Sequence, residues 1–291
     1  MRSWAIYAFL ACFIWGTSPI VAKLLFPTMP PLGVGFYRYL IGAPLLGLFL
    51  ASTRRNVARD AVRKVALYKY LVLGFLGVPV FTSLFYVGVE LTTAGKASLI
   101  YSANPIILIF LSSIFLHEKL NMRIVGLATL GFLGVFLVIT GGINPAEIVM
   151  SGAFMGDMLA LGAGMSWAVF SVAGKAWIRE IDSYASTAII VALGSMLMFP
   201  IAAAAGGLGF QVAVYELLLM LYLGVFTVAL AYLFWIKALA SAGVSRLGIF
   251  QFVIPAVSVA LGAVVLGEAV EVWILLGFIL LSASVYLAWK S

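Results

Sequence analysis

The sequence predicts an all-α integral membrane protein in which ten transmembrane helices form two inverted five-helix repeats around a central cavity. Of its 291 residues, 65% are hydrophobic and only 9% are charged, and the mean hydropathy is +1.19. A soluble fold needs a polar exterior that this composition cannot supply, so the lipid bilayer has to be the solvent. Apolar runs long enough to cross a bilayer, about 20 residues each, recur along the chain. A second observation is that several motifs occur twice.

The apolar runs leave room only for short loops, and turn-forming residues separate several of them. Pro27, Pro30 and Pro31 break the chain after the first run. Gly206-Gly207 does the same after the seventh. No soluble domain fits between the runs. The expected transmembrane spans are residues 4–25, 33–52, 69–90, 96–116, 122–141, 153–175, 184–205, 214–237, 245–266 and 271–289.

Lysine and arginine gather in alternate loops, which indicates the orientation of the chain. The opposite loops hold little beyond Lys96, with Lys23 near that end of the first span. We therefore expect a multi-pass protein of the cytoplasmic (inner) membrane with both termini in the cytoplasm. The net charge of +7 is assigned to these loops and not to nucleic-acid binding. The cations on the cytoplasmic side are Arg2, Arg54, Arg55, Arg59, Arg63, Lys64, Lys69, Lys119, Arg123, Arg179, Lys237, Arg246 and Lys290.

Motifs that recur at matching positions predict the repeats, residues 1–143 and residues 144–291. Spans one and six share a tryptophan–lysine pair at identical separation, and spans four and nine share a proline–glutamate pair. Each half then has five spans, and an odd number inverts the second half relative to the first. Inverted repeats are typical of secondary transporters, whereas a simple duplication would give a static bundle. The pairs are Trp15–Lys23 with Trp167–Lys175, and Pro105–Glu118 with Pro255–Glu268.

Further motifs extend the pattern over nearly the whole chain. In the first half they are Trp15-Gly16, Pro19, Lys23, Arg38, Thr92-Thr93-Ala94-Gly95, Ala97-Ser98, Asn104-Pro105, Glu118, Gly126, Gly131 and Gly134. In the second half they are Gly156-Asp157, Ser166-Trp167-Ala168, Lys175, Ala242-Gly243, Pro255, Gly267-Glu268 and Gly277. With these motifs the chain resembles the EamA branch of the drug/metabolite transporter (DMT) superfamily. The halves differ at Ser171, where Pro19 predicts a proline, and nothing in span seven matches Arg38.

The resemblance implies a ten-helix secondary transporter that moves a small organic metabolite by alternating access. Export of an amino acid is the specific expectation, with a small-molecule substrate and the lipid bilayer as partners. Uptake or transport of drugs and hydrophobic cations by the same fold, and a channel or lipid-handling protein, are the alternatives. Proton or exchange coupling and the oligomeric state stay open.

Residues with catalytic or metal-binding chemistry are scarce. His117 and Cys12 are the sole histidine and cysteine, which excludes a histidine-rich or cysteine-based metal site. No glycine-rich phosphate loop with a lysine is present. The sequence therefore predicts no enzyme, no metal and no cofactor.

Arg38 lies a few residues inside span two, where a cation is costly. Near the centre of a bilayer the cost is on the order of 2.5–3.5 kcal/mol, so the side chain should face a cavity or a partner. One hypothesis is that Arg38 binds a substrate carboxylate or gates the outer mouth. The alternatives are an ion pair with Glu90 or Asp157, or snorkelling to the interface.

Charges near span ends are expected to have simpler roles. Snorkelling is favoured for Lys23. For Glu118 and Glu268, which close spans four and nine, a hydrogen bond at a helix end or between helices is favoured.

Polar residues at or near prolines interrupt spans four and nine. Pro105 frees a carbonyl one turn back, and such a group is tolerated in lipid only where protein or a water-filled cavity satisfies it. Tyr101 and Asn104 share a face of the expected helix, and Gln251 precedes Pro255 similarly. We expect these faces to line the substrate cavity, with a kink buried between helices as the alternative.

Aromatic residues near span centres complete the candidate site. Trp15 and Trp167 occupy the repeated position, and further aromatic side chains lie at similar depths, which predicts an apolar pocket with few polar anchors. The candidate substrate-binding residues are Trp15, Arg38, Phe81, Phe85, Tyr101, Asn104, Trp167, Phe170, Tyr232 and Gln251.

Overall fold

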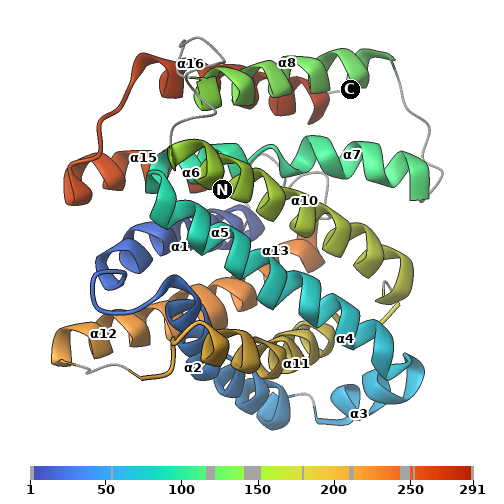
Figure 1. The fold of residues 1–291 in the computed structure, drawn as a ribbon. Helices are drawn as coiled ribbons and strands as arrows, with labels where there is room; N and C mark the ends of the chain where they lie inside the picture. The colour runs from blue at the N-terminus through green and yellow to red at the C-terminus, as the bar shows by residue number, and fades with distance from the viewer. Residues whose placement is uncertain are drawn as a thin grey trace.

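A computed structural model of the chain describes residues 3–53, 55–115, 122–140, 152–178, 180–209, 213–242, 250–251 and 253–289. Within these ranges the regular structure is helical throughout, and every expected span contains a helix (Figure 1). Seven helical stretches are long and apolar enough to cross a membrane, and three shorter apolar helices lie in spans five, nine and ten. The fold class of an all-helical membrane protein is confirmed. Glu118, His117, Gly243 and several cations used for orientation lie outside the described residues.

The helices follow the chain in the order expected from the apolar runs, with some spans built from two or three elements. They are α1 (Ser3–Leu25), α2 (Pro31–Thr53), α3 (Arg55–Lys64), α4 (Leu67–Phe75), η1 (Leu76–Val80), α5 (Phe81–Leu91), α6 (Ala94–Tyr101), α7 (Asn104–Phe115), α8 (Met122–Thr140), α10 (Gly152–Ile178), α11 (Ser183–Ala204), α12 (Val214–Tyr222), η2 (Leu223–Leu230), α13 (Ala231–Ala242), α15 (Val253–Leu266) and α16 (Val272–Trp289).

The basic loop after span two holds the short helix α3, which none of the apolar runs predicts. Its Ala61 is buried, and the Ala61 carbonyl accepts a hydrogen bond from the Tyr70 hydroxyl (3.4 Å). Arg63 and Lys64 on the same helix are exposed. An amphipathic helix with an apolar side against α11 and a basic side in water is typical of a membrane interface.

Spans three and eight each contain a π-helical segment, η1 and η2. A π turn departs from the regular hydrogen-bond pattern of an α-helix, and side chains add hydrogen bonds to the carbonyls of both segments. Ser166 Oγ of α10 donates to the carbonyl of Leu76 in η1 (2.9 Å). Trp15 Nε1 of α1 donates to the carbonyl of Thr227 in η2 (2.9 Å). In both spans the irregular segment is therefore held by a side chain from the other half of the chain.

Span four consists of two helices, α6 and α7, and is not the single kinked helix that the sequence predicts. The break follows Tyr101, and Asn104 Nδ2 donates to the Tyr101 carbonyl across it (3.3 Å). Pro105 then falls in the first turn of α7, where its missing N–H leaves no hydrogen bond unmade. Pro255 also lies in the first turn of its helix, α15. The expected start of span nine at residue 245 lies outside the described residues.

Helices from the two halves of the chain interleave. The helix α1 packs against α13 and α15, and α10 packs against α5, α6 and α7. The pair α8 and α16 lies together at one edge of the bundle, whereas α2 and α11, which also contact each other, lie toward the opposite edge (Figure 1).

Two glycines allow close helix contacts that have the same form in each half. A Cβ atom on Gly42 would lie 2.7 Å from the carbonyl oxygen of Gly224 and 2.5 Å from Val228. A Cβ atom on Gly194 would lie 2.7 Å from the carbonyl oxygen of Gly74 and would also meet a valine side chain. Small residues drive such contacts in membranes because they let backbones approach. At these contacts α2 packs closely against η2, and α11 packs closely against α4.

We expect Gly42→Val to destabilise the protein, because a side chain at this position would collide with the backbone of Gly224. Overpacking of this kind costs about 1–3 kcal/mol. Thermal unfolding in detergent should show a midpoint lower by about 5 °C. Gly47→Val on the same helix is the control, since a Cβ there meets nothing within 4 Å. Equal effects of both substitutions would contradict the proposed contact.

Candidate functional site

Arg38 of α2 is 6% exposed and is surrounded by hydroxyl groups. One terminal nitrogen, Nη1, donates to Tyr86 Oη (2.7 Å) and Ser18 Oγ (3.2 Å). The other, Nη2, donates to Tyr39 Oη (2.9 Å) and Thr82 Oγ1 (3.3 Å). We call the side chains of Ser18, Tyr39, Thr82 and Tyr86 the hydroxyl cage. It draws on α1, α2 and α5 and holds the guanidinium in one place.

Two tyrosine rings also cover the guanidinium. Its central carbon lies 4.5 Å from the ring centroid of Tyr39 and 4.6 Å from that of Tyr86. The alternative of snorkelling is wrong, because the side chain is buried. The alternative of an ion pair with Glu90 or Asp157 is also wrong. Glu90 is exposed, and the carboxylate of Asp157 binds a lysine on another helix.

Five of the predicted site residues form a continuous aromatic cluster between α5, α6 and α10. The ring centroid of Phe81 lies 5.3 Å from Trp167, 5.5 Å from Tyr101 and 5.7 Å from Phe85. Phe85 and Tyr101 are 5.4 Å apart, and Trp167 and Phe170 are 5.1 Å apart. We call these five side chains the aromatic cluster. The tertiary structure thus brings together residues from three spans, two in the first half of the chain and one in the second.

The aromatic cluster reaches the hydroxyl cage. The rings of Phe85 and Tyr86 lie 6.1 Å apart, and the hydroxyl of Tyr86 binds Arg38. On another side, Tyr232 of α13 lies near Arg38. The Trp15 ring lies 5.5 Å from the Tyr232 ring. A buried cation and an apolar aromatic surface are therefore neighbours in the middle of the bundle.

Asn104 and Gln251 have other positions. Asn104 is 4% exposed and binds the Tyr101 carbonyl, so it closes the break between α6 and α7 beside the aromatic cluster. Gln251 lies in a short turn before α15, next to Phe250, whose ring packs against Trp4 at the start of α1 (5.9 Å). No described contact joins Gln251 to the aromatic cluster.

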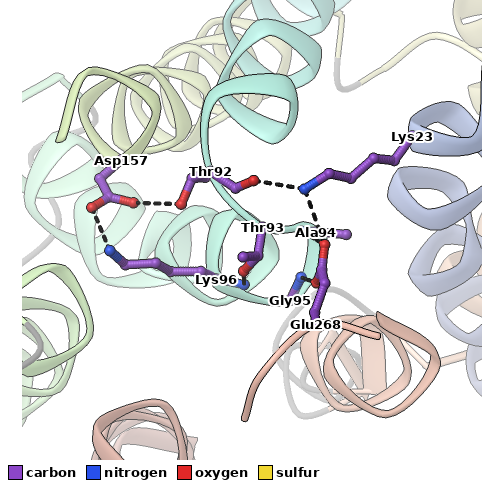
Figure 2. A network of polar contacts seen from close by, with 8 residues as sticks. All are labelled: Lys23, Thr92, Thr93, Ala94, Gly95, Lys96, Asp157 and Glu268. Carbon is purple, nitrogen blue, oxygen red and sulfur yellow. Dashed lines mark hydrogen bonds and ion pairs between the residues drawn. The ribbon is translucent and has the colours of Figure 1, made fainter. Parts of the chain in front are cut away.

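A second polar region lies where span three turns into span four. Asp157 of α10 is 1% exposed, and its Oδ2 pairs with Lys96 Nζ of α6 at 2.7 Å. Its other oxygen accepts from Thr92 Oγ1 (3.2 Å). Thr93 caps α6, since its Oγ1 accepts from the backbone N–H of Lys96 (3.1 Å). These contacts fasten α10 to the start of α6 (Figure 2).

Glu268 enters the same region from the connection between α15 and α16 (Figure 2). Its carboxylate accepts from the backbone N–H groups of Ala94 (2.7 Å) and Gly95 (3.2 Å), which lie at the positive N-terminal end of α6. The same carboxylate pairs with Lys23 Nζ at 3.1 Å, and Lys23 also donates to the Thr92 carbonyl (2.6 Å). The expected inter-helix hydrogen bond of Glu268 is confirmed. A carboxylate and a carbonyl hold the Lys23 ammonium group while its side chain is 25% exposed, and snorkelling of Lys23 stays a prediction.

A local backbone turn aims Glu268 at α6. Gly267 ends α15 with φ +67°, a conformation that side chains disfavour. The next N–H, that of Glu268, donates to the Gly262 carbonyl (3.0 Å), which closes the turn that follows α15. The carboxylate then lies against Gly262, where a Cβ atom would come within 2.5 Å of it.

Together, Lys23–Glu268 and Lys96–Asp157 form what we call the inter-half network. Each pair joins a lysine from residues 1–143 to a carboxylate from residues 144–291. Sequence reasoning identified all four charges but not their pairing. It missed the four hydroxyl residues of the cage altogether. A hydroxyl in an apolar span gives little signal, although Tyr39 and Arg38 are adjacent in the sequence.

We expect Asp157→Asn to lower the midpoint of thermal unfolding, because it leaves the Lys96 ammonium without its counter-charge. Removing one partner of a buried pair costs about 3–5 kcal/mol, and we expect the lower end because the Lys96 side chain is 18% exposed. The double variant Lys96→Met/Asp157→Leu should recover most of the loss. If the double variant is as unstable as the single one, the ion pair is not the cause.

The sequence model of the EamA-like transporter family matches this chain twice, at residues 2–140 and 154–290. An uncharacterized transporter of Archaeoglobus fulgidus is 26% identical over 96% of this chain and 94% of its own. A probable amino-acid metabolite efflux pump of Salmonella typhimurium is 27% identical over 96% of this chain and 92% of its own. A solved crystal structure with 20% sequence identity superposes with a TM-score of 0.71, covering 99% of this chain and 96% of the other, which shows a shared fold. The chain, matched by the family model over nearly its whole length, belongs to the EamA-like transporter family.

Proposed function

We propose that the protein is a secondary transporter that exports an amino acid or a similar small organic metabolite across the cytoplasmic membrane by alternating access, without catalytic chemistry. Membership in a transporter family supports the general activity. The similarity to the probable amino-acid metabolite efflux pump of Salmonella typhimurium supports the substrate class and the direction. The observation that carries the proposal is the buried guanidinium beside an aromatic cluster, built from helices of both halves.

The proposed architecture is a pair of inverted repeats, residues 1–143 and 144–291, with both termini in the cytoplasm. The two separate matches to one family model support the division. So do the π segments η1 and η2, which occur at corresponding places in spans three and eight. Contacts of Gly42 and Gly194 with η2 and α4 have matching geometry. Two interchangeable halves can rock about a shared central site, as alternating access requires.

The inter-half network has a proposed role in this cycle. The lysine and arginine distribution assigns the end of span one near Lys23, and the start of span four near Lys96, to the outer side. Both ion pairs join the halves there, so they hold the outer ends together. The outer side opens when Lys23 leaves Glu268 and Lys96 leaves Asp157. The described conformation is then the one closed to the outside.

The activity is tested by counterflow in proteoliposomes that contain the purified protein. Vesicles loaded with individual amino acids and related metabolites should accumulate the labelled solute from outside, and the exchange should saturate. Vesicles without protein are the control. A carrier gives saturable exchange because a solute has to bind before each half of the transport cycle, whereas a channel gives a flux without exchange. The absence of exchange with every amino acid would overturn the amino-acid assignment.

The alternating motion is tested with a crosslink across the outer ends. In a Cys12→Ala background, cysteines replacing Lys23 and Glu268 should be joined by a short bifunctional reagent, since the side chains meet at 3.1 Å. We expect the joined protein to lose counterflow and to regain it when the crosslink is cleaved. Each single-cysteine variant with the same reagent is the control. Full exchange by a fully crosslinked protein would contradict opening at this end.

A further inference from the structure

The guanidinium of Arg38 is a buried cation that no described carboxylate neutralises. Lys23 and Lys96, by contrast, each face a carboxylate, that of Glu268 and that of Asp157. Every described partner of Arg38 is instead a hydroxyl oxygen or an aromatic ring. These groups solvate the positive charge but do not cancel it. A charge kept in this state inside a membrane is costly and is typical of a functional site.

One donor of the guanidinium has no partner. The four N–H groups on Nη1 and Nη2 can be used by the hydroxyl cage, but Nε of Arg38 is buried without a hydrogen bond. A buried unsatisfied donor on a cation costs more than one on a neutral group. The guanidinium therefore has both an unbalanced charge and a free N–H, and an acceptor with negative charge would satisfy both.

The hydroxyl cage is suited to an anion. A hydroxyl oxygen that accepts from a guanidinium N–H still has its own O–H to donate. One such O–H is used within the cage, because Ser18 Oγ and Tyr86 Oη are hydrogen bonded to each other at 2.9 Å. The hydroxyls of Tyr39 and Thr82 add donors on the Nη2 side. A carboxylate matches this arrangement, since its two oxygens can accept from the planar guanidinium and from neighbouring hydroxyls.

The surroundings determine what is attached to the carboxylate. Tyr86 joins the hydroxyl cage to the aromatic cluster through its ring contact with Phe85. The buried carboxylate of Asp157 is already bound to Lys96. An ammonium group next to the bound carboxylate thus finds no described acidic partner, whereas an apolar body finds aromatic rings. The arrangement recognises the carboxylate and the apolar body, and it does not require an amine.

We propose that Arg38 and the hydroxyl cage form the carboxylate subsite of the transporter, and that the site accepts apolar monocarboxylates with or without an α-amino group. This inference rests on the proposed transport function and specifies its substrate class. In the empty protein the hydroxyl cage holds the guanidinium. On binding, the substrate carboxylate replaces part of the cage and supplies the missing counter-charge, and the aromatic cluster covers the apolar body.

The test uses the full-length protein in detergent and equilibrium binding of three probes of similar shape, in a chloride-free buffer. The probes are 3-phenylpropionate, its neutral amide 3-phenylpropanamide, and phenethylamine, which lacks a carboxylate. We expect 3-phenylpropionate to bind about tenfold or more tightly than either of the others, because a charge-assisted bidentate contact is lost in both. Comparable binding of the acid and its amide, or no binding of the acid at millimolar concentration, would overturn the proposal.

Two substitutions assign the effect to this site. Arg38→Gln should lower the affinity for 3-phenylpropionate to that for the amide and leave the amide unchanged. The exposed Arg63→Gln is the matched control and should have no effect. Should Arg38→Gln fail to fold, Tyr86→Phe keeps the ring and removes one hydroxyl of the cage, and it should weaken the acid selectively. An equal loss for acid and amide would indicate a purely structural role and overturn the subsite.

A second source of negative charge is an inorganic halide. If chloride is the ligand, it should raise the thermal stability of the wild type but not that of Arg38→Gln. The protein should then bind 3-phenylpropionate no more tightly than its amide. That outcome overturns the carboxylate subsite. Binding and transport are separate measurements, so the two proposals fail separately. Carboxylate-selective binding without counterflow contradicts the transport function, and counterflow without carboxylate selectivity contradicts the subsite alone.

Discussion

Water is absent from the core of a bilayer, so every carbonyl or N–H that a helix releases there has to be bound by another part of the protein. The helices of this protein are interrupted in the same spans that build its centre. Ser166 donates to a carbonyl of the π segment η1, and Trp15 donates to a carbonyl of η2. The first N–H groups of α6 rely on Glu268. These three contacts each join a backbone group of one half to a side chain of the other, which makes the two halves depend on each other for their backbone structure. The break between α6 and α7 is instead closed within its own half by Asn104.

The same constraint separates two kinds of charge inside the bundle. Lys23 and Lys96 have carboxylate partners and are held between helices near the start of span four. Arg38 has only hydroxyls and rings around it. Paired charges fasten helices together, and they can separate where water enters. A charge without a counter-ion in a medium of low dielectric constant attracts an anion strongly, because little else screens it. The inter-half network and the hydroxyl cage therefore suit different tasks, one in joining the halves and the other in binding a solute.

Some features of the centre were accessible from the sequence and others were not. The aromatic residues of spans three, four and six were predicted to lie at similar depths, and their rings do meet. Their contact with Arg38 was not predictable, because it runs through Tyr86, and nothing in an apolar span distinguishes a tyrosine that faces a cation from one that faces lipid. The partner of Lys23 was likewise out of reach. Lys23 and Glu268 are separated by 245 positions in the sequence, and only the packing of α1 against α15 brings them into contact.

The sequence by itself determined the membrane environment, the number and approximate limits of the apolar helices, the recurrence of motifs and the presence of a costly cation in span two. These follow from composition and periodicity, since hydrophobic transfer depends on residue type and run length. The tertiary structure decided where helices break, which charges meet and which hydroxyls surround Arg38. Those outcomes depend on backbone groups and side chains from distant spans approaching within hydrogen-bond distance. Gly267 illustrates the division: its residue type predicts a helix end, but only packing places Glu268 on α6.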